Sequence, residues 1–260
     1  MADISASLVS LGIWLAWMVG AYLLGAIPFG LLLGYVIAGV DIRRHGSGNI
    51  GATNLGRVVG WKYFPLALLL DFAKGALPVA TWLMYHGAWP ITNYSVNLYT
   101  SVPALGVPDT AALIGLAALA GHLWPIYLGF RGGKGVATGA GVVSVLMPIP
   151  TAIAAMVWGI VAWMTRYVSL SSLAAALTLA LAQITYTWPA SFSPQHRAAT
   201  LLALVGAALV FWRHWENIIR LWQGREGKIG QKAPSAPASS ETPARSPNSD
   251  SQAATPGESP

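Results

Sequence analysis

The sequence lacks cysteine and is poor in charge. None of its 260 residues is cysteine, which excludes disulfides, thiolate metal sites and thiol nucleophiles. Only 9% of the residues are charged, whereas a soluble domain carries about 25%. With 55% hydrophobic residues, the chain has too few polar side chains to cover itself with a water-facing surface. The composition therefore predicts an integral membrane protein.

The few charges that are present are mostly positive. The chain has 15 Lys and Arg against 9 Asp and Glu, a formal net charge of +6. These charges lie in short stretches between apolar segments rather than along helix faces. Such clustering argues against a nucleic-acid partner and indicates the positive-inside pattern of membrane proteins instead.

Seven apolar stretches predict an all-α polytopic membrane protein. The first exceeds the roughly 20 residues that cross a bilayer, and Pro28 is expected to kink or interrupt it. It lacks a charged leader and a cleavage site, so we expect a retained helix and no signal peptide. The fourth and fifth are short, which leaves six spans plus one re-entrant hairpin as the alternative. The stretches are about 8–40, 63–85, 110–128, 136–147, 151–164, 170–188 and 198–212.

Charge predicts how these spans are oriented. If the N-terminus lies outside, seven spans place the C-terminus inside. All cations except Arg197 and Lys74 then fall in inside segments, as the positive-inside rule requires. The tail 233–260 contains no large apolar side chain and is predicted to be disordered. We therefore expect a membrane domain at 1–232 and a cytoplasmic tail at 233–260.

The segment 41–62 is the first polar region that is unusual for a membrane protein. It reads DIRRHGSGNIGATNLGRVVGWK. Its glycines allow successive backbone N–H groups to face one point, which suits an anion, and Arg57 can bind a phosphate or carboxylate through two donors. The alternative is a flexible loop whose cations only set topology. The candidate hydrogen-bonding residues are Ser47, Gly48, Asn49, Thr53 and Asn54.

The segment 121–141 is a second candidate anion site. It reads GHLWPIYLGFRGGKGVATGAG, and its glycines precede an expected helix whose N-terminus favours negative charge. It is not a Walker A loop, because Leu128 and Gly135 stand where that motif needs Gly and Ser or Thr. The alternative is an interfacial turn with a lysine that reaches water. Three glycines surround the lysine: Gly132, Gly133 and Gly135 around Lys134.

The segment 213–228, RHWENIIRLWQGREGK, directly follows the last span. Its apolar and basic residues predict a short helix at the membrane face. His214 and Asn217 are three residues apart and lie on one side of that helix. Glu226 is the other polar candidate of this segment. A basic interfacial helix without a site is the alternative.

Asp71 and Lys74 lie deep in the second expected span, three residues apart. Ionisable groups at that depth pair with one another and face the protein interior. A structural ion pair and a substrate-binding role are both open, and we favour the structural one. If the topology holds, the three polar segments meet on the cytoplasmic side. Their expected ligand is anionic, with two phosphates or as two phosphorylated molecules, in contact with lipid.

Several motifs together resemble a known family. They are YLLGAIPFG at 22–30, GSGNIGATN followed by Arg57, DFAKG, GHLWPIYLGFRGGKGVAT and RHWENIIRLWQGREGK. In this order and spacing they are similar to the bacterial acyl-phosphate:glycerol-3-phosphate acyltransferase family (PlsY-type). The resemblance covers about 22–228, four-fifths of the chain.

The resemblance implies a multi-pass enzyme of the bacterial inner membrane, without metal or cofactor. Members transfer a fatty acyl group from acyl phosphate to the 1-hydroxyl of sn-glycerol 3-phosphate. The products are 1-acyl-sn-glycerol 3-phosphate (lysophosphatidic acid) and phosphate, in phospholipid biosynthesis. A soluble partner enzyme is expected to make the acyl phosphate.

This activity suits the polar segments, since two phosphate-bearing substrates meet two candidate anion sites. We expect Lys134, its three glycines and Arg57 to bind glycerol phosphate, with Thr138 of the same motif as a further contact. Acyl phosphate is a mixed anhydride with a good leaving group, so positioning and charge stabilisation are the tasks left to the protein. The residues expected at the acyl phosphate are Ser47, Gly48, Asn49 and Asn54.

The identity of the general base stays open at this point. His214 has a suitable side chain, the leaving phosphate is an alternative, and His122 is a third option. Asn217 and Glu226 are expected to organise the site, with Glu226 orienting a cation or His214. Two other functions compete with catalysis: a transporter of an organic phosphate, and a lipid-binding scaffold.

Overall fold

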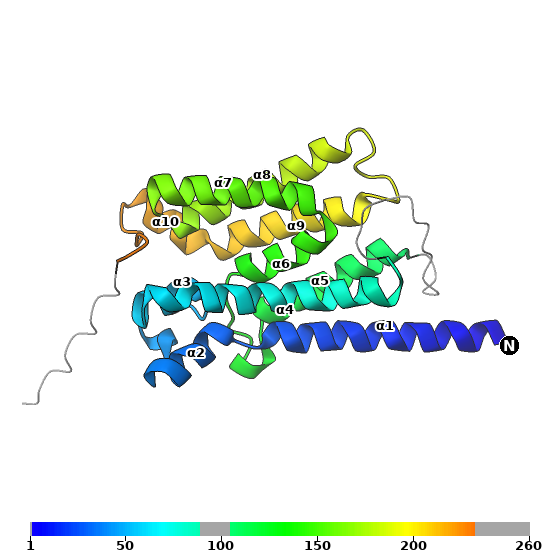
Figure 1. The fold of residues 1–260 in the computed structure, drawn as a ribbon, viewed down its shortest axis with the longest axis horizontal. Helices are drawn as coiled ribbons and strands as arrows, with labels where there is room; N and C mark the ends of the chain where they lie inside the picture. The colour runs from blue at the N-terminus through cyan, green and yellow to red at the C-terminus, as the bar shows by residue number, and fades with distance from the viewer. Residues whose placement is uncertain (1, 89–104, 232–260) are drawn as a thin grey trace, which may run out of the picture.

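The computed structural model describes residues 2–88 and 105–231, with side chains from residue 8 onward. The tail that is predicted to be disordered, 233–260, lies outside the described residues. The described parts of the chain fold into helices. Figure 1 shows the long helices side by side along one direction, with the N-terminus at one end of the bundle.

The first apolar stretch forms two helices rather than one. The first helix, α1, runs Ala2–Ala26 and the second, α2, runs Phe29–Ala38. The break falls at Ile27 and Pro28, because proline has no N–H to continue the helical hydrogen bonds. The predicted interruption at Pro28 is therefore confirmed.

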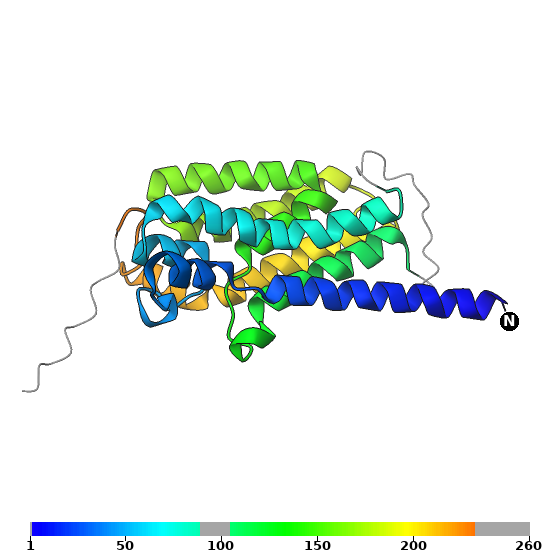
Figure 2. The ribbon, with the colours of Figure 1, turned by 60° about the horizontal axis from the view of Figure 1, so that its bottom comes forward.

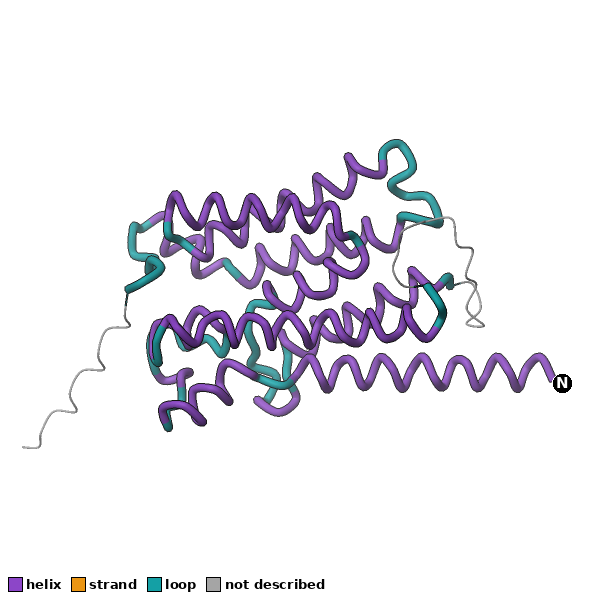
Figure 3. The backbone as a smooth tube through the Cα atoms, in the orientation of Figure 1, coloured by secondary structure: helices purple, strands orange, loops and turns teal. Residues whose placement is uncertain are grey.

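Six further helices follow the remaining apolar stretches (Figure 3). They are α4 (Phe64–Tyr85), α5 (Val107–Leu123), α6 (Val136–Leu146), α7 (Pro148–Thr165), α8 (Val168–Thr187) and α9 (Arg197–Arg213). Each lies within a few residues of its expected position. The all-α polytopic class is confirmed.

The number of candidate spans in the structure is smaller than the expected seven. Within the described residues, five helical segments are long and apolar enough to cross a membrane, and α9 with the following helix makes a sixth. The helix α6 has 11 residues, whereas a bilayer needs about 20. The expected count of seven is therefore not confirmed, and it stays a prediction.

The outer surface of the bundle is apolar. Large side chains such as Trp163 (84% exposed) and Val36 (82% exposed) point away from the protein. A water-facing protein rarely exposes contiguous apolar surface of this kind, whereas lipid solvates it. The described helices therefore present the surface of an integral membrane protein.

The helices α4 and α6 pack with their backbones in close contact. A Cβ atom at Gly75 would overlap the carbonyl of Thr138, and one at Gly141 would overlap the carbonyl of Phe72. Such close approach through small residues is typical of helix pairs in membranes. It fixes the short helix α6 against the long helix α4.

Short helices gather at the end of the bundle opposite the N-terminus, which we call the polar end (Figures 1 and 2). The expected loop 41–62 contains most of them, because a glycine N-cap at Gly51 lets ATNLGRV start a helix. The interfacial helix expected after the last span is present and bends by 56° from α9. The short elements at this end are η1 (Ile42–Arg44), α3 (Ala52–Val58), η2 (Trp61–Tyr63) and α10 (Trp215–Trp222), whereas η3 (Ile126–Leu128) lies nearer the middle of the bundle, beside the C-terminal end of α1.

Candidate active site

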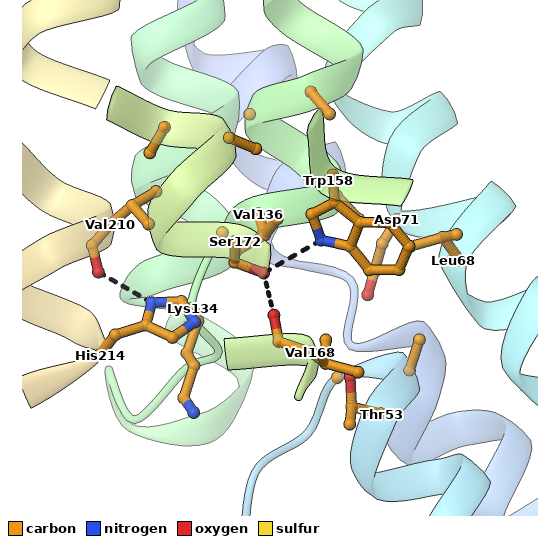
Figure 4. Close-up of a pocket in the computed structure, with 18 of the residues that line it drawn as sticks. Thr53, Leu68, Asp71, Lys134, Val136, Trp158, Val168, Ser172, Val210 and His214 are labelled. Carbon is orange, nitrogen blue, oxygen red and sulfur yellow. Dashed lines mark hydrogen bonds between the residues drawn. The ribbon is translucent and has the colours of Figure 1, made fainter. Parts of the chain in front are cut away.

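A cavity of about 420 Å³ opens between the helices and ends among the three polar segments. Its walls come from α4, α6, α7, α8 and α9, and its polar lining comes from the polar end. Figure 4 shows Lys134 and His214 close together in this cavity. The residues named in the sequence analysis that line it are Ser47, Asn49, Thr53, Asn54, Arg57, Asp71, His122, Lys134, Gly135, His214, Asn217 and Glu226.

Side-chain contacts join the second and third polar segments. The Lys134 ammonium donates a hydrogen bond to the side-chain oxygen of Asn217. The Asn217 amide in turn donates to Glu226 Oε1 at 2.8 Å. This chain of contacts holds Lys134 at the mouth of the cavity, where α6 begins immediately after the glycine turn.

The Glu226 carboxylate is the centre of this network. It accepts hydrogen bonds from Arg220 Nε at 2.9 Å and from Ser169 Oγ at 3.1 Å. Burial acts to raise the pKa of Glu226, but the hydrogen bonds from Arg220, Asn217 and Ser169 outweigh it and lower the pKa. Of the two roles expected for Glu226, the contacts show orientation of a cation, and that cation is Arg220.

Ser169 is a contact that the sequence analysis did not identify. It lies at the start of α8, where a serine ordinarily bonds to its own helix. Only the folded chain brings it to Glu226, 57 residues away. No pattern within the sequence distinguishes it from Ser171 or Ser172.

Arg57 connects the first and third polar segments. Its Nη2 donates to the carbonyl oxygen of Gly227 at 2.7 Å. Its Nε is buried and has no hydrogen-bond partner among the described residues. Burial lowers the pKa of Arg57, although the guanidinium stays charged at any physiological pH. The cavity thus contains a buried, charged donor that a ligand oxygen can satisfy.

Lys134 is a cation in an unfavourable environment. Burial lowers its pKa to about 8, and the neighbouring Arg220 and Arg57 act in the same direction while Glu226 opposes them. The three cations share the buried carboxylate of Glu226 and the exposed one of Glu216, which lies 3.7 Å from Arg220, so one positive charge stays unbalanced. An anionic ligand would compensate the unbalanced positive charge at this end of the cavity.

His214 lies at the end of α9 and is 3% exposed. Its Nδ1 lies 2.8 Å from the carbonyl oxygen of Val210, as the dashed line in Figure 4 marks. A carbonyl can only accept a hydrogen bond, so Nδ1 must carry the proton. The lone pair is then on Nε2, where it can accept a proton or a hydrogen bond from a ligand.

Asn54 organises the segment 41–51 from within. Its Nδ2 donates to the carbonyl oxygens of Ile42 and Asn49 at 2.7 and 2.9 Å, and also reaches that of His45 at 3.2 Å. Its Oδ1 accepts from the backbone N–H of Ser47 at 2.9 Å. Every polar atom of this side chain is engaged, so Asn54 shapes the wall of the cavity.

The glycines before Lys134 do not form the expected N–H cradle. The guanidinium of Arg213 donates to the carbonyl oxygens of Gly132 at 3.0 Å and Gly133 at 2.8 Å. The N–H of Gly133 donates to the carbonyl of His122 at 3.1 Å. Gly132 and Gly133 are not among the residues lining the cavity, and both carbonyls and the N–H of Gly133 bind protein partners, so the described structure does not contain the expected cradle.

Two other expected contacts lie away from the cavity. Thr138 is fully buried in the contact between α4 and α6, so helix packing occupies it. Gly48 lines a separate surface hollow together with Arg43 and Arg44. Neither is among the residues that line the cavity.

Asp71 and Lys74 form a buried ion pair of 2.8 Å. Lys74 also donates to the carbonyl oxygen of Ile27 at 2.7 Å, at the break between α1 and α2. The His122 Nδ1 lies 3.8 Å from the Asp71 carboxylate. These contacts hold the broken first span against α4 and α5, in line with the structural role, while Asp71 and His122 also line the cavity, so the substrate-binding alternative stays untested.

Beyond the polar end, the cavity continues as an apolar space between α6, α7, α8 and α9, which we call the gallery. Small residues line much of it: Gly139, Ala140, Ala154, Ala155, Ala175, Ala176, Gly206 and Ala207. Trp158 is a large exception, and its Nε1 donates to Ser172 Oγ at 3.3 Å (Figure 4). No group of three or more His, Asp or Glu that could hold a metal occurs within the described ranges.

Comparison with known proteins gives a consistent result. The family model for glycerol-3-phosphate acyltransferase matches residues 15–224. The glycerol-3-phosphate acyltransferase of Desulforamulus reducens is 41% identical over 83% of this chain and 94% of its own length. That of Trichlorobacter lovleyi is 43% identical over 83% of this chain and 97% of its own length.

Two crystal structures of PlsY (YgiH), an integral membrane glycerol 3-phosphate acyltransferase, are also similar. The glycerol 3-phosphate form has a TM-score of 0.69 at 36% identity, and covers 84% of this chain and 96% of that chain. The lysophosphatidic acid form has a TM-score of 0.66 at 37% identity, and covers 84% and 95%.

Proposed function

Because this chain belongs to the glycerol-3-phosphate acyltransferase family, we propose that it takes its acyl group from acyl phosphate. The acceptor is the 1-hydroxyl of sn-glycerol 3-phosphate. The products are 1-acyl-sn-glycerol 3-phosphate and inorganic phosphate, which places the reaction in phospholipid biosynthesis.

The observation that carries this proposal is the composition of the cavity between the helices. One end is lined by Lys134 and Arg57 together with the Glu226 carboxylate, and the other end is the apolar gallery. A phosphate group suits the first and a fatty acyl chain suits the second. Glycerol phosphate, acyl phosphate and the acylated product all carry one or both of these groups.

In this proposal Lys134 and Arg57 bind the phosphate of glycerol 3-phosphate. Asn217 and Glu226 are positioning residues, since Asn217 binds Lys134 and Glu226 in turn accepts from Asn217. Ser47 and Asn49, which also line the cavity, are the donors for the acyl phosphate. Loss of one such donor typically costs about 2.7 to 4 kcal/mol in the transition state.

The chemistry needs no enzyme nucleophile. The glycerol hydroxyl attacks the acyl carbon, the bond from that carbon to the phosphate oxygen breaks, and inorganic phosphate leaves. The hydroxyl proton passes either to His214 Nε2 or to the leaving phosphate. His214→Ala distinguishes these routes: a variant that keeps most of its turnover favours the phosphate.

The decisive experiment uses purified protein in detergent with labelled glycerol 3-phosphate. Palmitoyl phosphate and palmitoyl-CoA are supplied in parallel, and labelled lysophosphatidic acid is measured. Product from palmitoyl phosphate alone is the expected result, with Lys134→Ala raising the KM for glycerol 3-phosphate. Product from palmitoyl-CoA alone would contradict the proposed donor. If Lys134→Ala raised only the KM for the acyl donor, Lys134 would bind the acyl phosphate and not glycerol 3-phosphate.

We also propose that the membrane is the bacterial inner membrane, with the polar end and the tail 233–260 in the cytoplasm. A soluble enzyme that forms acyl phosphate would then supply the donor at the same side. The chain has no cysteine, so a single cysteine placed in 233–260 reports orientation cleanly. Labelling of intact cells by an impermeant reagent at this cysteine would contradict the orientation. Truncation of 233–260 is expected to preserve activity.

A further inference from the structure

The gallery has a gap in its α9 wall at Gly206. The residues of α9 that line the cavity include Leu202, Gly206, Val210 and His214, each four positions from the next. Residues at this spacing lie on one face of a helix, so position 206 faces the gallery between two large apolar side chains. With 1.5 Å per residue, it lies about 12 Å along α9 from His214, and Leu202 lies about 18 Å away.

The gap at Gly206 is not needed for helix packing. A Cβ atom built there has no heavy atom within 4 Å, in contrast to Gly75 and Gly141, where it would overlap backbone. A glycine in the middle of a helix costs about 0.5–1 kcal/mol relative to alanine. Glycine at position 206 therefore leaves open space inside the cavity without serving helix packing, and this space is available to a ligand.

We propose that Gly206 determines the length of acyl chain that this protein accepts. The inference rests on the proposed function, since it assumes that the acyl chain occupies the gallery. A chain that extends from the polar end beyond position 206 passes the glycine and reaches the space near Leu202. A side chain at 206 would close that passage and leave room for shorter chains only.

The chain offers a matched control at Gly159. This residue lies in the middle of α7, is exposed, and also has nothing within 4 Å of its Cβ position. It is not among the described residues that line the cavity. Gly206→Leu and Gly159→Leu therefore make the same chemical change in a helix interior, one inside the gallery and one outside it.

The test compares kcat/KM for octanoyl phosphate and palmitoyl phosphate in wild type, Gly206→Leu and Gly159→Leu. Each methylene excluded from the gallery lowers kcat/KM roughly fourfold. Gly206→Leu is expected to lower the palmitoyl-to-octanoyl ratio at least about tenfold, and Gly159→Leu to leave it unchanged. An unchanged ratio in Gly206→Leu, or an equal loss with both donors in folded protein, would overturn the inference.

Two further measurements test the role of Gly206 even if Gly206→Leu unfolds or the protein shows no turnover. Gly206→Ala adds one methyl group and should shift the ratio in the same direction by a smaller amount, even if the leucine variant unfolds. Thermal stabilisation by octyl and hexadecyl phosphate reports occupancy of the gallery without catalysis. If wild type makes no product, the proposed function fails, whereas equal stabilisation of Gly206→Leu and wild type by hexadecyl phosphate refutes the role of Gly206.

Discussion

The two glycine-rich segments look alike in sequence, but the structure builds them differently. In 46–54, the side chain of Asn54 binds the backbone from inside and leaves Ser47 and Asn49 at the cavity. In 129–135, the carbonyls of Gly132 and Gly133 accept from Arg213, and the cavity receives only Lys134 and Gly135. Glycine content permits a tight turn, but the partners of its N–H and C=O groups decide what it can bind.

The conformation of the first segment, 46–54, should depend most strongly on the side chain of Asn54. Asn54→Ala removes the donor to Ile42 and Asn49 and the acceptor for Ser47, leaving several buried polar groups unpaired at about 1–3 kcal/mol each. We expect activity to fall at least 100-fold and the melting temperature to decrease. Initial rates and tryptophan fluorescence on heating measure the two effects.

Asn54→Asp is the matched control, since it keeps the acceptor oxygen and the shape but loses both amide protons. It should retain the contact with Ser47 and lose the contacts with Ile42 and Asn49. Near-wild-type activity in Asn54→Ala would show that the segment holds its shape without this side chain.

In the second segment, 129–135, substrate binding should depend on the absence of a side chain at Gly133. A Cβ atom at Gly133 would overlap the imidazole of His122, and overpacking typically costs about 1–3 kcal/mol. Because Lys134 is the next residue, we expect Gly133→Ala to raise the KM for glycerol 3-phosphate at least about tenfold with a smaller change in kcat. Gly159→Ala, which has open space, is the control. If the KM for the acyl donor rose more than the KM for glycerol 3-phosphate, this segment would bind the acyl donor instead.

The charge of Lys134 provides a third test of how the segments 46–54 and 129–135 differ. Its pKa is lowered to about 8, so the ammonium that binds phosphate is present below this pH and is lost as the pH rises through it. From pH 7 to pH 9 the charged fraction falls about tenfold, and the KM for glycerol 3-phosphate should rise by a similar factor. In Lys134→Arg the guanidinium stays charged, and the KM should vary little over this range. If the KM for glycerol 3-phosphate varied with pH in the same way in wild type and in Lys134→Arg, a group other than Lys134 would control binding.

Long apolar runs made the helices predictable, because burial in lipid requires continuous helical hydrogen bonding. The break at Pro28 was predictable as well, because proline has no N–H to continue those hydrogen bonds. The pattern of apolar runs does not predict α3, whose seven residues lie in a glycine-rich stretch without an apolar period. Nor does it predict the contact of Ser169 with Glu226 or the direction of the Gly133 carbonyl, since both depend on residues distant in sequence.

The smallest effect is expected at Gly48, which the sequence analysis placed beside the acyl phosphate. The structure places it in the surface hollow with Arg43, and its φ of +68° is the reason for glycine there. Gly48→Ala should cost roughly 1–2 kcal/mol of stability through backbone strain. We expect kcat/KM to stay within about threefold of wild type, because the cavity wall is formed by Ser47 and Asn49 on either side. A loss as large as that of Gly133→Ala would show that the Gly48 backbone contacts the substrate, and the two segments would then be anion sites of the same kind.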